Sequence, residues 1–451
     1  MKKVVLLNSA FITKRKDMVQ NTEPHLRIGM ASIAASLLEE NMDVIIIDPQ
    51  LEKMTCEKLA SRILQDNPDY LGLPAYTEEI YDANDIVTEV KKHKKDVIAL
   101  VGGHQVTALP QETLEEFPSF DIGVMGEGET TIRRIVRGDA LEEIPGIIYR
   151  NNEGTVIENP LRDDYESLDT LPFPAWHLLD LKRYYELMPI EPLRGCPYHC
   201  VFCFRSLGTK VRYKSPERIL DELEHNIRTY GFKRYAFKCG TFPLSKSHAM
   251  DIFNGIKRRG IQITWVASTR VDVLDEELIQ AMKDTGCEDV SLGIESGDPD
   301  ILKSCGKNTT PEKAEEVLKQ LKKVGIDSVE MNFILGLPGE TRESLLRTKD
   351  FALRMAPYSS RVNFAILTAF PATDIYDMAL REEGGFRLKT KDWRNFGKQA
   401  GMTLEHANFK EKELVKYQLR FYLAYYLRSP LKVIKLFSVD RFLGLLKKFF
   451  V

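Results

Sequence analysis

The stretch Arg194-Gly195-Cys196-Pro197-Tyr198-His199-Cys200-Val201-Phe202-Cys203 decides how the rest of this chain is interpreted. It holds three of the seven cysteines, at spacings of four and three. Three thiolates suit one metal centre, but a structural zinc ion normally has four protein ligands. An iron–sulfur cubane on three cysteines leaves one iron open. The spacing therefore predicts a [4Fe–4S] cluster on Cys196, Cys200 and Cys203; an incomplete zinc knuckle and chance spacing are the alternatives.

The composition indicates a globular protein with more than one domain. The chain has 451 residues, of which 43% are hydrophobic and 29% charged, and its formal net charge is -3. This length exceeds what one hydrophobic core usually serves, and the charge does not favour nucleic-acid binding. Clustered cysteines indicate a metal site in a reducing compartment. Because we find no signal peptide and no bilayer-length apolar run, we expect a cytoplasmic protein.

Residues 1–140 alternate between strand and helix patterns, which indicates a doubly wound, Rossmann-like parallel sheet. Apolar runs predict strands at 4–7, 44–47, 70–73, 97–101 and 122–125, and the spacing of apolar residues predicts helices at 28–40, 56–66 and 85–95. Ligands of such sheets bind beyond the carboxyl ends of the strands. Two glycine-containing segments follow predicted strands, Gly102-Gly103-His104 and Gly126-Glu127-Gly128. Glycines there let the backbone approach a bulky ligand closely.

Residues 141–190 have the character of a linker, with a small hairpin that turns at 151–154 and a proline-rich strap at 171–176. Residues 191–385 then repeat a strand–helix pattern. The first predicted strand ends at 193–195, and the others are 234–237, 263–267, 289–294, 328–335 and 361–367. This pattern predicts a partial TIM-type (β/α)6 barrel, whose catalytic groups lie at the carboxyl ends of the strands.

The cysteine spacing, with Phe202 before the third cysteine, resembles the radical S-adenosylmethionine (SAM) superfamily. Segments 264–270, 293–297, 334–341 and 368–373 resemble further SAM-facing motifs of that superfamily. The resemblance implies that the open iron binds SAM. Reductive cleavage of SAM then gives a 5′-deoxyadenosyl radical, with an electron from an external donor such as flavodoxin or ferredoxin. The SAM contacts that the resemblance implies are Phe202, Arg270, Glu295, Ser296, Gly336 and Pro338. For Arg270 a plain ion pair is the alternative, and for the 293–297 segment a capping turn.

One departure from this superfamily follows the second predicted barrel strand. Related proteins commonly carry an acidic pair where this chain has Cys239 and Gly240. A thiol S–H can donate a hydrogen atom, so Cys239 is a candidate catalytic residue. The alternative is a small buried side chain that fills space.

The segments 25–37, 101–110 and 126–129 resemble the cobalamin-binding domain that precedes many radical SAM cores. The resemblance implies cobalamin contacts at Gly102, Gly103, His104, Gly126, Glu127 and Gly128. The Asp-x-His-x-x-Gly motif of other cobalamin proteins is absent, so we expect a lower cobalt face that is open or bound by water.

With cobalamin bound, the resemblance implies a C-methyltransferase that acts on an unactivated carbon of a small-molecule or lipid substrate. A ring-forming, rearranging or oxidising radical SAM enzyme, with or without cobalamin, is the alternative within enzymes. A module that senses cobalamin or redox state without turnover is the alternative from another class.

Residues 386–451 form a basic tail that we predict to be helical. The segment 410–451 contains ten Lys or Arg and three acids, with many aromatic residues. We expect 410–427 to cover the barrel. For 431–451 the pattern predicts contact with the inner face of a membrane, and a second covering helix is the alternative.

Overall fold

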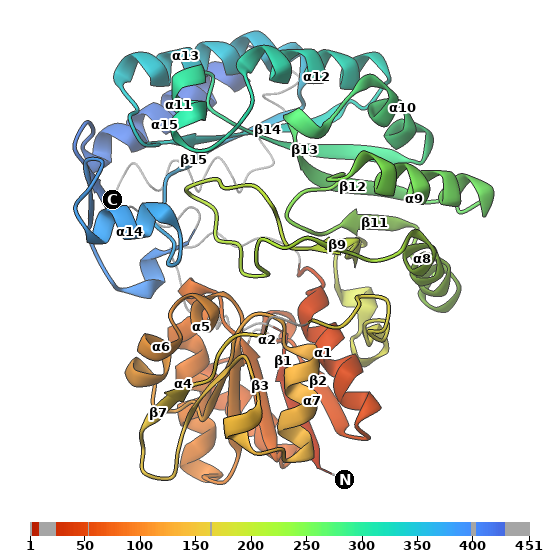
Figure 1. Cartoon of the computed structure of the whole chain (residues 1–451), viewed down its shortest axis with the longest axis vertical. Helices are drawn as coiled ribbons and strands as arrows, with labels where there is room; N and C mark the ends of the chain where they lie inside the picture. The colour runs from red at the N-terminus through yellow and green to blue at the C-terminus, as the bar shows by residue number, and fades with distance from the viewer. Residues whose placement is uncertain (1, 9–23, 53, 163–164, 398–402, 429–451) are drawn as a thin grey trace.

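The computed structural model describes residues 2–8, 24–52, 54–162, 165–397 and 403–428. Figure 1 shows two α/β bodies, one above the other, with the chain's N-terminal part below and the later part above. Each body is built on its own sheet of mainly parallel strands. The segment that contains the three cysteines runs between the two bodies (Figure 1).

The lower body contains a seven-stranded sheet with the order β2-β1-β3-β4-β5-β6-β7. Its strands are β1 (Lys3–Leu7), β2 (Asp43–Ile47), β3 (Tyr70–Pro74), β4 (Ile98–Gly102), β5 (Ile122–Val124), β6 (Ile147–Arg150) and β7 (Val156–Glu158). The first five strands are parallel. The longer helices around them are α1 (Ile28–Glu39), α3 (Cys56–Gln65), α4 (Ile80–His93) and α7 (Glu129–Arg137). The Rossmann-like prediction is confirmed, although α4 begins before the predicted 85.

The hairpin predicted for the linker belongs to this first sheet instead. β6 pairs antiparallel with β5, and β7 pairs antiparallel with β6. Ile147, Ile148 and Tyr149 are fully or almost fully buried. These apolar side chains cover the edge of the parallel sheet, which is the physical reason that the hairpin joins it.

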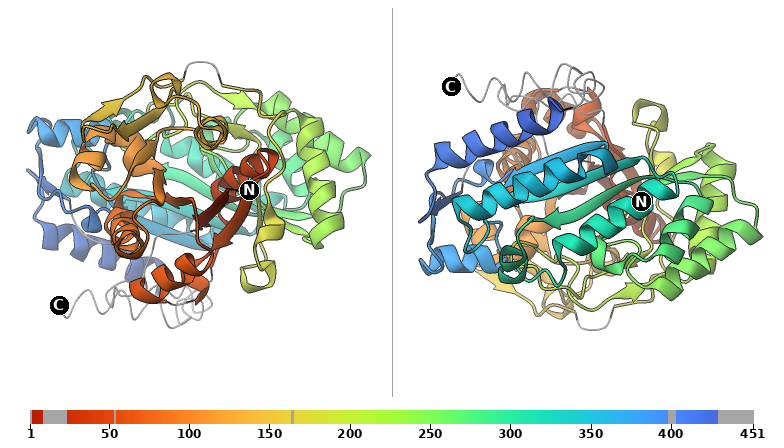
Figure 2. Two further views of the ribbon diagram at one scale, coloured as in Figure 1. Left: turned by 90° about the horizontal axis from the view of Figure 1, so that it is seen from below. Right: turned by 90° about the horizontal axis from the view of Figure 1, so that it is seen from above.

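The upper body contains a six-stranded parallel sheet with the order β15-β14-β13-β12-β11-β8. Its strands are β8 (Met188–Ile190), β11 (Arg234–Phe237), β12 (Thr264–Arg270), β13 (Cys287–Glu295), β14 (Ser328–Leu335) and β15 (Arg361–Ile366). The helices between them are α8 (Pro216–Tyr230), α9 (Lys246–Arg258), α10 (Glu276–Asp284), α12 (Pro311–Lys323) and α13 (Arg342–Met355). Figure 2 shows these helices as a layer over one face of the sheet. The predicted partial (β/α)6 barrel is therefore confirmed.

The first barrel strand is β8, which ends at Ile190, so the prediction that this strand ends at 193–195 is wrong. Pro192 has no N–H for a sheet hydrogen bond, and the chain leaves the barrel before it. The next residues form β9 (Leu193–Arg194), which pairs antiparallel with β10 (Arg212–Tyr213). This small ladder holds the two ends of the cysteine segment together.

The C-terminal region adds a hairpin and a helix. The sequence did not predict the hairpin of β16 (Phe386–Leu388) and β17 (Leu404–His406). Helix α15 (Glu411–Tyr426) packs on β15, where the Tyr422 hydroxyl accepts a 3.0 Å hydrogen bond from the backbone N–H of Phe364. The predicted covering helix is thus confirmed, whereas 431–451 lies outside the described residues. In the described ranges, no helix combines the length and apolar character needed to cross a membrane.

Replacing Phe421 with alanine tests whether α15 is an integral part of the barrel. The Phe421 ring is buried and lies 5.5 Å from the ring of Phe364. We expect Phe421→Ala to lower the free energy of unfolding by about 3–5 kcal/mol, as large-to-small core changes do. Urea titration measures it. Leu427→Ala, at a site 70% exposed, is the control and should change stability by less than ~0.5 kcal/mol. Equal effects would contradict the packing role.

Candidate active site between the two sheets

The cysteine segment is held by its own backbone contacts. The N–H of Cys196 donates to the carbonyl of Gly208 at 3.2 Å, and the N–H of Val201 donates to the carbonyl of Cys305 at 3.2 Å. The segment also passes very close to its neighbours. A Cβ added at Gly306, where φ is +74°, would lie 2.1 Å from the carbonyl oxygen of His199. Only glycine fits there, so the fold itself fixes the path of the cysteines.

The three thiols fit an iron–sulfur cluster better than a single ion. In the part of the chain that the structure describes, no three His, Cys, Asp or Glu side chains converge as ligands of one metal ion. A cubane does not require this, because each cysteine binds a different iron. Burial raises the pKa of the Cys200 thiol, and the cations of Lys307 and Arg270 oppose that shift. Positive charge beside the sulfur favours the thiolate that iron needs.

Arg270 and Glu295 lie at the carboxyl ends of β12 and β13, as predicted. The Arg270 guanidinium donates to Cys200 Sγ at 3.4 Å, stacks on the ring of Tyr198 and forms two 2.8 Å bonds with Asp272. The ion-pair alternative is therefore present together with contact to the cysteine segment. The SAM-carboxylate role of Arg270 stays a prediction.

Glu295 has a strained backbone and a buried partner. Its φ is +71°, a conformation that side chains other than glycine rarely adopt and that occurs often at functional sites. Its carboxylate lies 2.8 Å from Nζ of Lys307, and both side chains are at most 10% exposed. Lys307 also donates to the carbonyl of Gly293 at 2.5 Å. The pairing of Lys307 with Glu295 was not predicted from the sequence, because the two residues are twelve positions apart, across a turn and a short helix, α11 (Pro299–Ser304).

Gly336 and Pro338 form a tight loop after β14. Glu340 accepts hydrogen bonds from the backbone N–H groups of Gly336 and Leu337, and Ser304 donates to the Pro338 carbonyl at 2.8 Å. Gly336 has a φ of +91°. The sequence did not predict that Glu340 holds this loop in place, although Glu340 belongs to the motif 334–341. The loop is rigid enough to present backbone atoms to an adenine, which is its predicted role.

Two other predicted SAM residues face the protein interior. Ser296 is fully buried. Its hydroxyl lies 3.0 Å from that of Thr348 and accepts a hydrogen bond from the N–H of Asp298. Its side chain is thus used inside the fold, and the SAM contact of Ser296 stays a prediction. Phe202 is partly buried and packs against a hydrophobic cluster whose members include Leu337 and Ala369. Its aromatic ring therefore anchors the cysteine segment.

Cys239 lies near the cluster cysteines. It is partly buried against the barrel core, and an added Cβ on the adjacent Gly240 would lie 3.3 Å from Cβ of Cys196. Burial raises the pKa of the Cys239 thiol to about 12. The sulfur therefore keeps its proton at neutral pH, as both the catalytic and the space-filling interpretation require. Its catalytic role stays a prediction.

The predicted cobalamin residues line the edge of the first sheet that faces the cysteine segment. The ring of His104 lies 5.6 Å from that of Phe204, and its Nε2 lies 3.5 Å from Ser206 Oγ. A Cβ on Gly103 would lie 3.0 Å from the Ala75 carbonyl. The next residue, Gln105, is fully buried, and neither of its amide atoms meets a hydrogen-bond partner among the described residues. A buried amide without a partner is costly, so this edge fits a polar ligand such as cobalamin.

Glu127 takes part in an ion-pair network that joins the two bodies. Arg194, the first residue of the cysteine stretch, lies 2.7 Å from Glu127, 2.6 Å from Glu129 and 2.8 Å from Glu191. Arg212 also pairs with Glu127. Burial would raise the pKa of Glu129, but Arg194 lowers it overall. Glu127 is therefore engaged by arginines, and a cobalamin contact through it stays a prediction. Arg194 and Glu129 were quoted in the motifs, but sequence alone did not reveal that they meet.

Glu340→Gln tests whether the carboxyl group of Glu340, in the loop after β14, is protonated at neutral pH. Burial raises the pKa of Glu340 to about 8, despite two backbone hydrogen bonds that lower it. Its contribution to stability is thus present below its unfolded pKa of roughly 4.3 and is lost as pH rises through 8. In urea titrations we expect the stability of Glu340→Gln relative to the wild type to rise between about pH 4 and pH 8, and the variant to be the more stable protein at pH 9. Glu343→Gln, at an exposed position, is the control, and parallel pH profiles for Glu340→Gln and wild type would contradict the assignment.

Arg194→Met tests the interdomain network. The substitution leaves three carboxylates buried with less compensation, which costs about 3–5 kcal/mol in comparable buried pairs. Urea titration measures the loss. The matched control is Arg133→Met on α7, whose ion pairs with Glu39 and Glu166 are more exposed. It should cost less than ~1 kcal/mol. A loss for Arg194→Met no larger than the control's would mean that the network does not hold the bodies together.

Comparison with known proteins agrees with both halves of this site. The chain matches the family model of the radical SAM superfamily over residues 190–352 and that of the B12 binding domain over residues 20–136. An uncharacterized methyltransferase of Pyrococcus horikoshii is 35% identical over 95% of this chain and 93% of its own length. A hopanoid C-3 methylase of Methylococcus capsulatus is 26% identical over 88% of this chain and 76% of its own.

A third relative and two solved structures complete the comparison. The anaerobic magnesium-protoporphyrin IX monomethyl ester cyclase of Rubrivivax gelatinosus is 27% identical, over 78% of this chain and 65% of the cyclase. The methyltransferase TsrM of Kitasatospora setae, solved with cobalamin and a [4Fe–4S] cluster, has a TM-score of 0.72 and 20% identity over 88% of this chain and 83% of its own. The cobalamin-dependent radical enzyme OxsB has a TM-score of 0.73 and 20% identity over 99% of this chain and 72% of its own. Together with the site geometry, these matches show that the chain belongs to the radical SAM enzymes that carry a B12-binding domain.

Proposed function

We infer that this protein is a cobalamin-dependent radical SAM methyltransferase that methylates an unactivated carbon of a small molecule. The observation that carries the proposal is that the glycine-rich edge of the first sheet directly contacts the cysteine segment, through His104, Phe204 and Ser206. A site that held only SAM would not need this edge. The 35% identical relative, an uncharacterized methyltransferase, supports the same reaction class.

The chain's own residues would position the cofactors. Cys196, Cys200 and Cys203 would hold the cluster, and the loop around Gly336 would receive the adenine of SAM. When bound, the cluster, SAM and cobalamin supply radical formation and methyl transfer, while the protein supplies orientation and excludes water. Arg270 and Lys307 place positive charge beside Cys200. An external one-electron donor such as flavodoxin or ferredoxin would reduce the cluster.

Ring formation is a second candidate, because one relative is a cyclase. Both reactions begin with the same radical, and they differ in whether a methyl group reaches the product. A sensor without turnover is less well supported, because the barrel keeps its SAM-facing loops beside the cysteines.

Isotope transfer tests the reaction class. We expect anaerobically purified protein to contain close to one cobalamin per chain and to transfer the label of [methyl-²H₃]SAM to a product in a cell extract. Mass spectrometry measures the transfer. Bound cobalamin without labelled product, while extract stimulates formation of 5′-deoxyadenosine, would favour the cyclase class. Protein that retains its cluster but never cleaves SAM would contradict enzymatic function.

Cys200→Ala tests the cluster assignment. Removing one of three thiolates should abolish cluster binding and reduce SAM cleavage to background, because the cluster supplies the electron. Iron and sulfide analysis and 5′-deoxyadenosine formation provide the two measurements. Cys56→Ala, in the first body and far from the cysteine segment in sequence, is the control and should retain both properties. Full SAM cleavage by Cys200→Ala would refute the ligand assignment.

A further inference from the structure

The inner face of the barrel sheet is polar. Register pairs place side chains of β12, β13, β14 and β15 in rows across the sheet. One row contains Arg270, Gly293, Asn332 and Asn363. Because Arg270 contacts Cys200 Sγ, this row faces the cysteine segment. The amides of Asn332 and Asn363 therefore lie on the face where the radical would form, on β14 beside β13 and on the edge strand β15.

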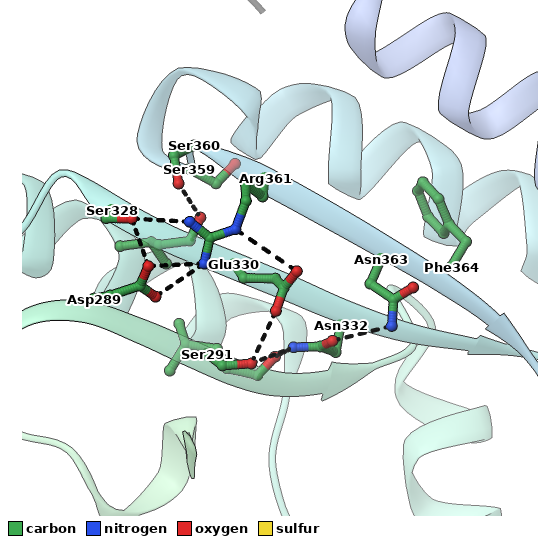
Figure 3. Close-up of polar contacts among 12 residues, drawn as sticks. Asp289, Ser291, Ser328, Glu330, Asn332, Ser359, Ser360, Arg361, Asn363 and Phe364 are labelled. Carbon is green, nitrogen blue, oxygen red and sulfur yellow. Dashed lines mark hydrogen bonds and ion pairs between the residues drawn. The ribbon is translucent and has the colours of Figure 1, made fainter. Parts of the chain in front are cut away.

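A second polar row lies one step toward the amino ends of the strands. It contains Ser268, Ser291, Glu330 and Arg361. Arg361 forms 2.9 and 2.8 Å hydrogen bonds with the carboxylate of Asp289 and lies 3.8 Å from Glu330. Figure 3 shows how these side chains connect to the first row, where Nδ2 of Asn332 donates to Ser291 at 2.9 Å. Polar contacts join five of these residues into one continuous set, which consists of Ser291, Glu330, Asn332, Arg361 and Asn363.

The opposite face of the same strands is apolar. Its buried side chains include Leu292, Met331, Phe333, Val362 and Phe364, which pack under the helices. The polar face therefore does not result from a generally hydrophilic sheet. Inward side chains of a closed TIM barrel usually fill the centre with branched apolar groups. Here the inward positions carry amides, hydroxyls and charges instead.

The polar rows are also accessible. The side chains of Arg361, Glu330 and Asp289 are 33%, 24% and 20% exposed. They contribute two negative charges and one positive charge. A hydrocarbon placed here would bury these groups without new partners, which is costly. A molecule with several negative charges would meet a surface of net negative charge.

We propose that this surface, defined as Ser268, Ser291, Glu330, Asn332, Arg361 and Asn363, is the substrate-binding floor of the barrel. It selects a small water-soluble molecule that presents hydroxyl, amide or amine groups and does not carry several negative charges. Asn363 is the main specificity-determining residue. Its Nδ2 donates to Asn332 Oδ1 at 3.2 Å and its Oδ1 accepts from the Tyr422 hydroxyl at 3.0 Å, which leaves one N–H and one lone pair for a ligand. Asn332 donates to Ser291 and to the Leu292 carbonyl, so it offers a ligand the second lone pair of its Oδ1. The inference rests on the proposed function, and it disfavours the lipid substrate that the sequence left open.

The test follows labelled methyl groups into two fractions of one extract. Holoenzyme is incubated under reducing conditions with [methyl-²H₃]SAM and either the water-soluble or the chloroform-soluble fraction of an extract from the cells that encode this chain. Mass spectrometry detects labelled products, and 5′-deoxyadenosine is measured in the same samples. We expect labelled product in the water-soluble fraction.

Substitution of Asn363 connects the product to the floor. Asn363→Leu removes the amide, and we expect at least a tenfold lower yield of labelled product per 5′-deoxyadenosine formed. Loss of folding would lower both quantities together and leave their ratio unchanged. Asn363→Asp, which keeps the shape but turns a donor into an acceptor, serves if the leucine variant does not accumulate. Asn254→Leu on the exposed side of α9 makes the same chemical change as the control.

The outcomes separate this inference from the proposed function. Label found in the chloroform-soluble fraction would overturn the polar floor and leave methylation intact. An unchanged ratio in both Asn363 variants would overturn the role of the floor as well. No label in either fraction would overturn methylation itself, and with it the inference.

Discussion

The structure depends on a buried arginine. Arg194 precedes Cys196 by two residues and contacts three carboxylates, two of them from the other body. Withdrawing a guanidinium and three carboxylates from water is expensive, and only good geometry offsets that cost. The network is favourable only when both bodies are in place. It therefore couples the glycine-rich edge of the first sheet to the segment that carries the cysteines.

The parallel strands of the two sheets differ in which of their faces are buried. In the first sheet the central strands are buried on both faces, so they appear in the sequence as continuous apolar runs. In the barrel sheet one face packs under helices while the other carries polar side chains, as at Leu292 and Ser291 on β13. An alternating strand gives the site a rigid apolar support and a chemically specific surface together. Six strands suffice because the barrel does not have to fill its own centre.

Much of this fold was predictable from the sequence, because strand runs and helix caps are local. β11 and β14 begin and end at the predicted residues. The errors arise where pairing between distant segments decides the structure. β6 joins β5 because its apolar side chains fit that edge, and Pro192 moves the first barrel strand to β8. The spacing of the cysteines predicts cluster ligands, whereas the partners of Arg194, Glu295 and Asn363 could not be predicted, because they meet only in the folded chain.

The proposed reaction requires three groups around one substrate carbon, and the fold supplies a separate element for each. In this proposal the barrel loops at Glu295 and Gly336 would contact SAM, and the edge at His104 would contact cobalamin. The floor around Asn332 and Asn363 would then contact the substrate from the remaining side. Cys239 and Gly240 replace the acidic pair of related enzymes. Glu295 lies near enough to raise the pKa of the Cys200 and Cys203 thiols, but Lys307 already neutralises its charge. Orientation of a polar substrate therefore falls to the uncharged amides of the floor rather than to a carboxylate beside the cluster.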